Sequence, residues 1–295
     1  MAHSHDHSHF AAETIPQDGQ KRRAFIIGIA LNLLYVLAEL IYGFLYNSMA
    51  LLTDAGHNAS DVASLLLSLI GFWMAGKKSS ASFTYGYKKT TVLAALANAV
   101  ILLIAVGILG FESIRRFWHP QPVQGPVVAW VSGLGLLINA ITAFLFFRNR
   151  QQDLNIKSAY LHMLADALVS LGVLVAGILI YFTGWNWLDP LTGLIIMLVI
   201  LVGTWGLLRD SFKMSIDAVP NGIVLDEIKN VMLGIPHVQE VHHVHIWPMS
   251  TTENALTANV VLSDQLSFQE KLALVDEIKH ELLHHNIQHS TIEMK

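Results

Sequence analysis

The sequence contains no cysteine among its 295 residues, which excludes disulfide bonds and thiolate metal sites. Charged residues are also scarce, at 14%, whereas hydrophobic residues make up 53% and the mean hydropathy is +0.49. This balance is too apolar for an ordinary soluble domain and indicates a protein that crosses a lipid bilayer several times. The small net charge of −4 gives no sign of nucleic-acid binding.

Six apolar segments are each close to the ~20 residues that a membrane helix requires. Lysine and arginine gather before the first segment and after the second, fourth and sixth, which places both termini in the cytoplasm. Tryptophans flank the opposite loops, as expected at a membrane interface. We therefore expect a multi-pass protein of the cell inner membrane, with helices at 24–46, 49–75, 90–114, 126–147, 158–183 and 189–208.

Histidine is distributed unevenly. Four of the fifteen histidines lie in the first nine residues, MAHSHDHSH, and eight lie beyond residue 230. The N-terminal run is too polar for a signal peptide, so residues 1–20 are either a disordered, dispensable metal-scavenging tail, which we favour, or a cloning artefact. In the C-terminal part, His280 and His284 lie four residues apart on a predicted helix. We expect both to be solvated histidines on the protein surface.

The composition changes after the predicted membrane region, 21–209, and residues 210–295 read as a separate small domain, here called the C-terminal domain. Helical spacing over 222–233 is followed by strand patterns at 241–247 and 256–262. Ser267 and Glu270 form a predicted capping box that opens a second helix, and 287–294 is a final strand. This αββαβ order predicts a ferredoxin-like α+β fold with two helices over one sheet face.

Two copies of one motif lie inside apolar segments. His57 precedes Asp61 by four residues in the second segment, and His162 precedes Asp166 by four residues in the fifth. Residues four apart share one face of a helix, so each histidine lies beside its aspartate. A carboxylate within a membrane costs about 2.5–3.5 kcal/mol on insertion scales and therefore indicates function. Facing each other, the two pairs make a two-nitrogen, two-oxygen set suited to a tetrahedral divalent metal, zinc above all.

Two further carboxylates lie within the apolar segments. Asp54 falls on the same helical face as His57 and Asp61, and is expected to support His57 or to line an access path. Glu39 is expected to hydrogen-bond between helices or to line a wet cavity.

The sequence resembles the cation diffusion facilitator family over nearly its whole length. The matching stretches are LLTDAGHNASD, FTYGYKK, AYLHMLADALVSLG, FTGWNWLDP and HHVHIW. The resemblance implies a homodimeric antiporter that exports metal from the cytoplasm against protons. It implies that His57, Asp61, His162 and Asp166 are the transport ligands, and that a histidine at the first motif position marks zinc preference.

The resemblance also implies a metal site in the C-terminal domain, with His242 as a ligand and His289 as a second candidate. Three residues depart from the family pattern there. His243 stands where the family motif usually has an aspartate. Asn259 stands where the family often has a ligand histidine, and Lys295 stands where it has a glutamate. The site is therefore either rebuilt or absent. The loop 76–89 contains neither His nor Asp, so no metal site is expected there.

The expected function is a zinc efflux transporter of the metal-resistance type, not an enzyme. Metal and protons compete for the same four groups, so alternate exposure of the site would exchange cytoplasmic Zn²⁺ for external protons. One alternative is efflux of a broader range of ions, such as Cd²⁺, Co²⁺, Ni²⁺ or Fe²⁺. Another is an intramembrane zinc metalloenzyme that uses Glu39 or Asp54 as a general base. A third is a metal sensor whose C-terminal domain reports zinc to a partner.

Overall fold

The structure, a computed structural model, describes residues 33–147 and 154–295. The N-terminal histidine run and the first part of the predicted first span lie outside the described residues. The described chain has five helices that are long and apolar enough to cross a membrane, and a shorter apolar helix, Leu33–Leu45. These five are α2 (Met49–Ala75), α3 (Thr90–Trp118), α4 (Gly125–Phe147), α5 (Leu154–Thr183) and α6 (Leu188–Ser215).

Several helices extend beyond the predicted apolar segments, because a helix continues past the hydrocarbon region into its charged ends. In α3 the extension contains Arg115 and Arg116, which pair with Glu112 at distances of 3.0 and 2.8 Å. These ion pairs join residues three and four positions apart on one helix. The polytopic helical fold is confirmed, and only the helix ends differ from the prediction.

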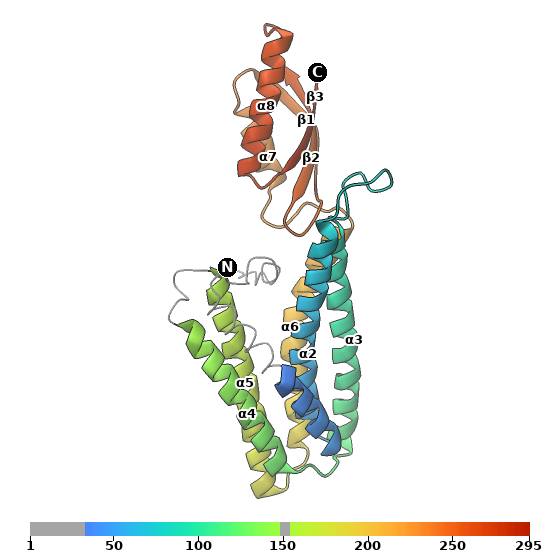
Figure 1. Cartoon of the computed structure of the whole chain (residues 1–295), viewed down its shortest axis with the longest axis vertical. Helices are drawn as coiled ribbons and strands as arrows, with labels where there is room; N and C mark the ends of the chain where they lie inside the picture. Colours follow the sequence, from blue (N-terminus) through green and yellow to red (C-terminus); the bar gives the residue numbers. More distant parts are fainter. Residues whose placement is uncertain (1–32, 148–153) are drawn as a thin grey trace. The chain divides into compact units, whose positions relative to one another are not determined.

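One compact unit combines the described residues of Met1–Leu67 with Asn98–Gly206. Helices α4 and α5 pack side by side in it (Figure 1). Gly125 and Gly177 permit this approach, since a Cβ atom at Gly177 would lie 2.7 Å from the backbone nitrogen of Ala129. Small residues allow such close contact between membrane helices. The core of this unit consists of Tyr35, Ala50, Leu51, Leu102, Val106, Val128, Val131, Val173, Ile196 and Ile200.

A buried cap fixes the start of α2 in this unit. Asp189, at the beginning of α6, accepts hydrogen bonds from the Ser48 hydroxyl and from the backbone nitrogen of Met49, both 2.5 Å long. It is 1% exposed. The carboxylate therefore satisfies amide and hydroxyl donors at the N-terminus of α2, a helix end that favours negative charge.

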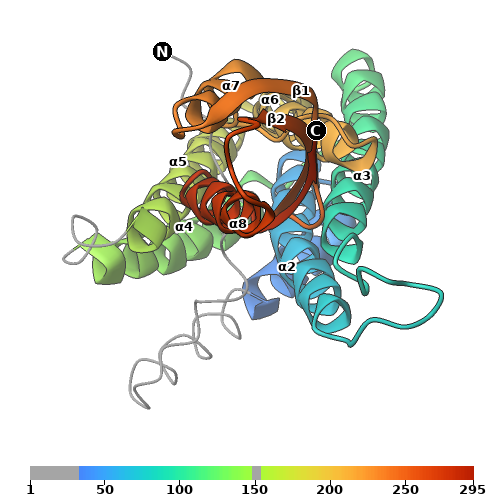
Figure 2. The same ribbon diagram turned by 90° about the horizontal axis from the view of Figure 1, so that it is seen from above.

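The second compact unit combines Ser68–Ala97 with Leu207–Lys295 and includes the C-terminal domain. Its elements are α7 (Leu225–Leu233), β1 (Val238–Pro248), β2 (Asn254–Leu262), α8 (Phe268–His284) and β3 (His289–Met294). The sheet order is β1-β2-β3, with β1 antiparallel and β3 parallel to β2. Helices α7 and α8 cover one sheet face (Figures 1 and 2), so the predicted αββαβ order is confirmed.

The helix start predicted at Ser267 is also confirmed. The Ser267 side chain accepts from the Glu270 backbone nitrogen, and the Glu270 carboxylate accepts from the Ser267 backbone nitrogen at 2.7 Å. Hydrogen bonds from the side chain and backbone of Ser267 lower the pKa of Glu270 below its ordinary value. The ionised glutamate therefore belongs to the cap of α8.

Lys89 joins three parts of the second unit. Its Nζ atom donates to the carbonyl oxygens of Met214 and Pro248, at 2.8 and 2.9 Å, and to Asp217 Oδ1 at 2.5 Å. The lysine precedes α3, Met214 and Asp217 lie at the end of α6, and Pro248 ends β1. One ammonium group thus holds the N-terminal end of α3 to the segment that leads into the sheet.

Candidate metal-binding site

The two motifs lie on facing helices, with His57 and Asp61 on α2 and His162 and Asp166 on α5. The shortest contacts cross between the helices. His57 Nε2 lies 3.4 Å from Asp166 Oδ1, and His162 Nε2 lies 3.3 Å from Asp61 Oδ2. Within α5, His162 Nε2 is 3.6 Å from Asp166 Oδ2. Each aspartate therefore approaches the histidine of the other motif, which helical periodicity alone could not specify.

The arrangement has the dimensions of a metal site. Among the residues that the structure describes, His57, Asp61 and Asp166 form the group of three whose ligand atoms lie within 4.8 Å of one another. His162 adjoins them, and its ring lies 6.3 Å from that of His57, centroid to centroid. The Asp166 side chain is 3% exposed and those of the other three are 22 to 32% exposed. The set is thus largely shielded from solvent but not closed off.

Two buried polar atoms of these side chains lack hydrogen-bond partners. They are Nδ1 of His57 and Oδ1 of Asp166, both buried. An unpaired buried polar atom is costly, and binding of a cation removes that cost. The donor chemistry of two imidazoles and two carboxylates fits a tetrahedral divalent ion.

The predicted spans placed Asp166 about five residues from the middle of its helix, whereas Asp61 lay near the middle of its own. In the structure α5 begins at Leu154 rather than near residue 158, and it runs to Thr183. Its middle therefore moves toward Asp166, which reduces the mismatch by about two residues, or roughly 3 Å.

A second set of polar side chains lies buried next to the ligands. Glu39 and Asp54 are 0 and 1% exposed. The Asn58 amide donates to Glu39 Oε2 at 3.0 Å, while both oxygens of Asp54 and the hydroxyls of Tyr35 and Ser170 have no hydrogen-bond partner. Sequence reasoning singled out Glu39 and Asp54 but missed the other three. Tyr35 precedes Glu39 by four residues, a helical spacing that could have identified it.

The two histidines predicted for the C-terminal domain lie at different places in its sheet. His242, on β1, is exposed and lies opposite Asn259, and its Nε2 is 2.6 Å from Glu240 Oε2. His289 begins β3 beside Ala255, and its ring packs edge-on against Tyr85. Because Asn259 lies opposite Glu293 on β3, four residues beyond His289, one copy of the chain does not align the two histidines.

Two of the residues that depart from the family pattern in this domain, Asn259 and Lys295, contact each other. With its amide oriented to satisfy both neighbours, Asn259 donates to Glu293 Oε2 at 2.8 Å and accepts from Lys295 Nζ at 2.9 Å. The amide thus bridges an acidic and a basic side chain at the position where a ligand histidine was expected. That arrangement needs no metal ion to balance its charge.

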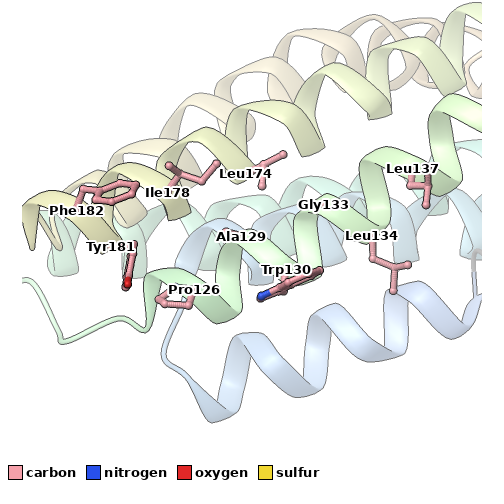
Figure 3. Close-up of a pocket in the computed structure, with 10 residues that line it drawn as sticks. All are labelled: Pro126, Ala129, Trp130, Gly133, Leu134, Leu137, Leu174, Ile178, Tyr181 and Phe182. Atoms are coloured by element: carbon pink, nitrogen blue, oxygen red, sulfur yellow. The ribbon is translucent and has the colours of Figure 1, made fainter.

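A hollow between α4 and α5 has a different character (Figure 3). Its lining is almost wholly apolar and contains no carboxylate or imidazole. It therefore offers no metal ligands and is set apart from the motif cluster by its chemistry. The residues that line it are Pro126, Ala129, Trp130, Gly133, Leu134, Leu137, Leu174, Ile178, Tyr181 and Phe182.

Comparison with known proteins covers both parts of the chain. Residues 25–214 match the cation efflux transmembrane domain, and residues 220–295 match the cytoplasmic domain of cation efflux proteins. The cadmium, cobalt and zinc/H(+)-K(+) antiporter of Bacillus subtilis is 37% identical over 94% of this chain and 90% of its own length. The zinc transporter ZitB of Escherichia coli is 34% identical over 100% of this chain and 93% of its own. The cation efflux system protein CzcD of Alcaligenes is 32% identical over 99% of this chain and 89% of its own.

Proposed function

Because the chain belongs to the cation efflux family, we propose that it exports Zn²⁺ from the cytoplasm in exchange for protons. The two domain matches and the relatives support a multi-pass membrane transporter of divalent cations. The chain is accordingly a transporter and not an enzyme, so the intramembrane metalloenzyme is set aside. The cluster of His57, Asp61, His162 and Asp166 is the observation that supports zinc as the transported ion.

In this proposal the four side chains are the transport ligands. Two carboxylates neutralise the charge of a divalent ion, and two imidazoles supply the nitrogen donors that zinc accepts in a tetrahedral site. Their closest contacts join α2 to α5, so binding of the ion ties the two helices together. A shift of either helix would then change both the ligand set and its access to water.

Proton exchange follows from the same ligands. A metal ion requires unprotonated imidazoles and carboxylates, so protons compete with zinc for the nitrogen and oxygen atoms that hold it. If the site opens to one side of the membrane at a time, protons arriving from outside displace zinc there. Zinc arriving from the cytoplasm displaces protons on the inner side, so proton entry drives zinc export without ATP.

We assign Glu39 and Asp54 to the surroundings of the site and to the access path. Their burial near the ligands, and the unpaired oxygens of Asp54, support this role. Asn58 follows His57 in α2 and donates to Glu39, so it connects the helix Leu33–Leu45 to the ligand-bearing turn. Glu39 thereby helps to orient that turn.

The remaining assignments concern topology and assembly. We propose that 1–20 is a metal-scavenging tail, 21–209 the transport domain and 210–295 a cytoplasmic dimerisation domain, in a homodimer of the inner membrane with both termini inside the cell. Metal binding at His242 and His289 stays a prediction, and it would require ligands from elsewhere because the two lie apart in one sheet. Two of the relatives are named for cadmium and cobalt as well as zinc, which favours a broader ion range as the second candidate.

Asp166→Ala tests the transport site. The substitution leaves three ligands and removes the most buried carboxylate, so zinc flux should fall to background. Uptake into proteoliposomes would be followed with a zinc dye and a luminal pH dye together. Asp276→Ala, which removes an exposed carboxylate on α8, is the matched control and should transport normally.

Wild-type protein should move protons opposite to zinc, and collapse of the pH gradient should slow uptake. Near-normal flux in Asp166→Ala would overturn the ligand assignment. Transport that follows the membrane potential but ignores the pH gradient would instead indicate a channel or uniporter.

A further inference from the structure

Helix α8 carries the run His280-Glu281-Leu282-Leu283-His284 near its C-terminal end. Two histidines separated by three residues, with glutamate after the first, form the pattern by which one helix presents two imidazoles to a zinc ion. Leu282 is fully buried in the core of the C-terminal domain, whereas both histidines are exposed. The pair therefore points away from the core, where an ion can reach it.

The two rings are already close enough to share an ion. Their centroids lie 5.2 Å apart, with an angle of 60° between the planes. Two imidazoles bound to one zinc at about 2.0–2.1 Å and separated by a tetrahedral angle have centroids roughly 5 Å apart. Solvated histidines that merely share a helix face need not bring their rings to this distance.

The surrounding charge also favours a cation. Glu277 lies three residues before His280, and Glu281 lies three residues before His284, so helical spacing puts both exposed glutamates on the face that carries the pair. Glu281 also lies 3.8 Å from the ring of His285. A surface with two imidazoles and two carboxylates suits a divalent transition metal better than a hard ion such as Mg²⁺.

We propose that His280 and His284 bind a divalent transition-metal ion of the zinc class on the surface of the C-terminal domain. This site lies on α8 and shares no residue with the transport ligands or with His242 and His289. It is a binding site and not a hydrolytic centre, because a catalytic zinc of this motif needs a third protein ligand. Among the described residues, the group of three at metal distance is the one that contains His57, Asp61 and Asp166.

Histidine footprinting of the intact chain tests this site directly. The purified, metal-free protein in detergent is treated with diethylpyrocarbonate, which modifies free imidazole nitrogens, while ZnCl₂ is titrated. Mass spectrometry then reports each histidine separately, so binding at the transport site or at the N-terminal run does not obscure α8. MgCl₂ serves as the ion control.

We expect His280 and His284 to become protected together at one zinc concentration, and not with magnesium. In His284→Ala the chelate is lost, so protection of His280 should require roughly 100-fold more zinc. His280→Ala should have the reciprocal effect on His284. His285→Ala is the matched control, since it removes a neighbouring imidazole just past the end of α8 and should leave the pair unchanged.

Three results would overturn the proposal. One is unchanged labelling of both histidines across the zinc titration. Another is protection of His280 in His284→Ala at the wild-type zinc concentration, which would mean that a lone imidazole or an aggregate accounts for it. The last is equal loss of protection in His285→Ala.

Discussion

At the residue scale, His57 decides the composition of the proposed ligand set. It supplies one of the two nitrogen donors, and its ring lies 3.4 Å from the carboxylate of Asp166 on the neighbouring helix. With aspartate in its place, the set would hold one nitrogen donor and three carboxylates. Such a set is harder and more negative, and carboxylates can bind through one or two oxygens, so it adapts to larger ions.

His57→Asp should therefore keep some transport while its preference for zinc decreases, with cadmium or manganese gaining relative to zinc. Competition between zinc and cadmium in proteoliposomes, at matched amounts of wild type and variant, measures the change. His119→Asp offers a control at a histidine outside the site and should leave the ratio unaltered. If His57→Asp retains the wild-type ratio, another residue sets selectivity.

The grouping of the four proposed ligands could be predicted in part from sequence, because helical periodicity puts His57 and Asp61 on one face, as it does His162 and Asp166. The crosswise contacts could not, because they depend on how α2 and α5 approach each other. The run at 280–284 illustrates a different limit. Its spacing is visible in the sequence, but only the ring separation of 5.2 Å distinguishes a prepared pair from two solvated histidines.

At the element scale, close helix contact depends on Gly177. A Cβ atom there would lie 2.7 Å from the backbone nitrogen of Ala129 and 3.0 Å from the carbonyl oxygen of Gly125. Backbone atoms cannot move aside as a flexible side chain can, so α4 and α5 would have to separate. Overpacking of this kind costs about 1–3 kcal/mol.

Gly177→Ala should consequently lower the thermal stability of the detergent-solubilised protein and reduce zinc flux, since α5 carries two proposed ligands. Gly172→Ala is the matched control on the same helix, because its added Cβ meets open space. Fluorescence-detected size exclusion after heating compares the two variants. Equal stability of both would show that the close approach at Gly177 is not needed.

The cap at Ser267 stabilises α8 in the C-terminal domain. Loss of an N-terminal cap costs about 1 kcal/mol, so Ser267→Ala should speed hydrogen exchange in the first turn of α8. Hydrogen bonds from Ser267 lower the pKa of Glu270. The stabilisation of α8 by ionised Glu270 is therefore fully present above the ordinary glutamate pKa, and it is lost as the pH falls through the lowered pKa of Glu270. The difference between Ser267→Ala and wild type should therefore shrink in acid. A difference that grows in acid would contradict the proposed role of ionised Glu270.

The helices and strands of the C-terminal domain could be predicted from sequence because their hydrophobic periodicity is local. The cap of α8 could be predicted because Ser267 and Glu270 lie three residues apart. The cap on α2 was not accessible in this way. Asp189 and the Met49 nitrogen that it accepts from are 140 positions apart, so no local pattern joins them. From sequence, an aspartate at the start of an apolar helix is predicted to cap that helix. Asp189 instead caps α2, a different helix.

At the scale of the whole molecule, Lys89 connects the loop between α2 and α3 with the C-terminal end of α6 and with β1. Its side chain is 34% exposed, so its hydrogen bonds with Met214, Asp217 and Pro248 are only partly screened by solvent. Neighbouring Lys88 has a single ion-pair partner, Glu253. Lys89 is therefore one of the links between the C-terminal domain and the ends of α3 and α6, together with Lys88 and with Thr91, which accepts a hydrogen bond from the Thr251 backbone nitrogen.

Lys89→Ala should reduce the maximal rate of zinc uptake several-fold, since three polar partners lose one donor group and each charge-assisted hydrogen bond contributes about 1.5–3 kcal/mol before exposure is considered. Zinc binding measured by calorimetry should stay close to wild type, because none of the proposed ligands is altered.

Lys89→Arg should recover part of the rate by restoring the positive charge. Lys88→Ala should have a smaller effect, and Lys78→Ala, at an exposed position of the same loop, should have none. If Lys89→Ala and Lys78→Ala transport equally well, the C-terminal domain does not act on the membrane helices through this lysine.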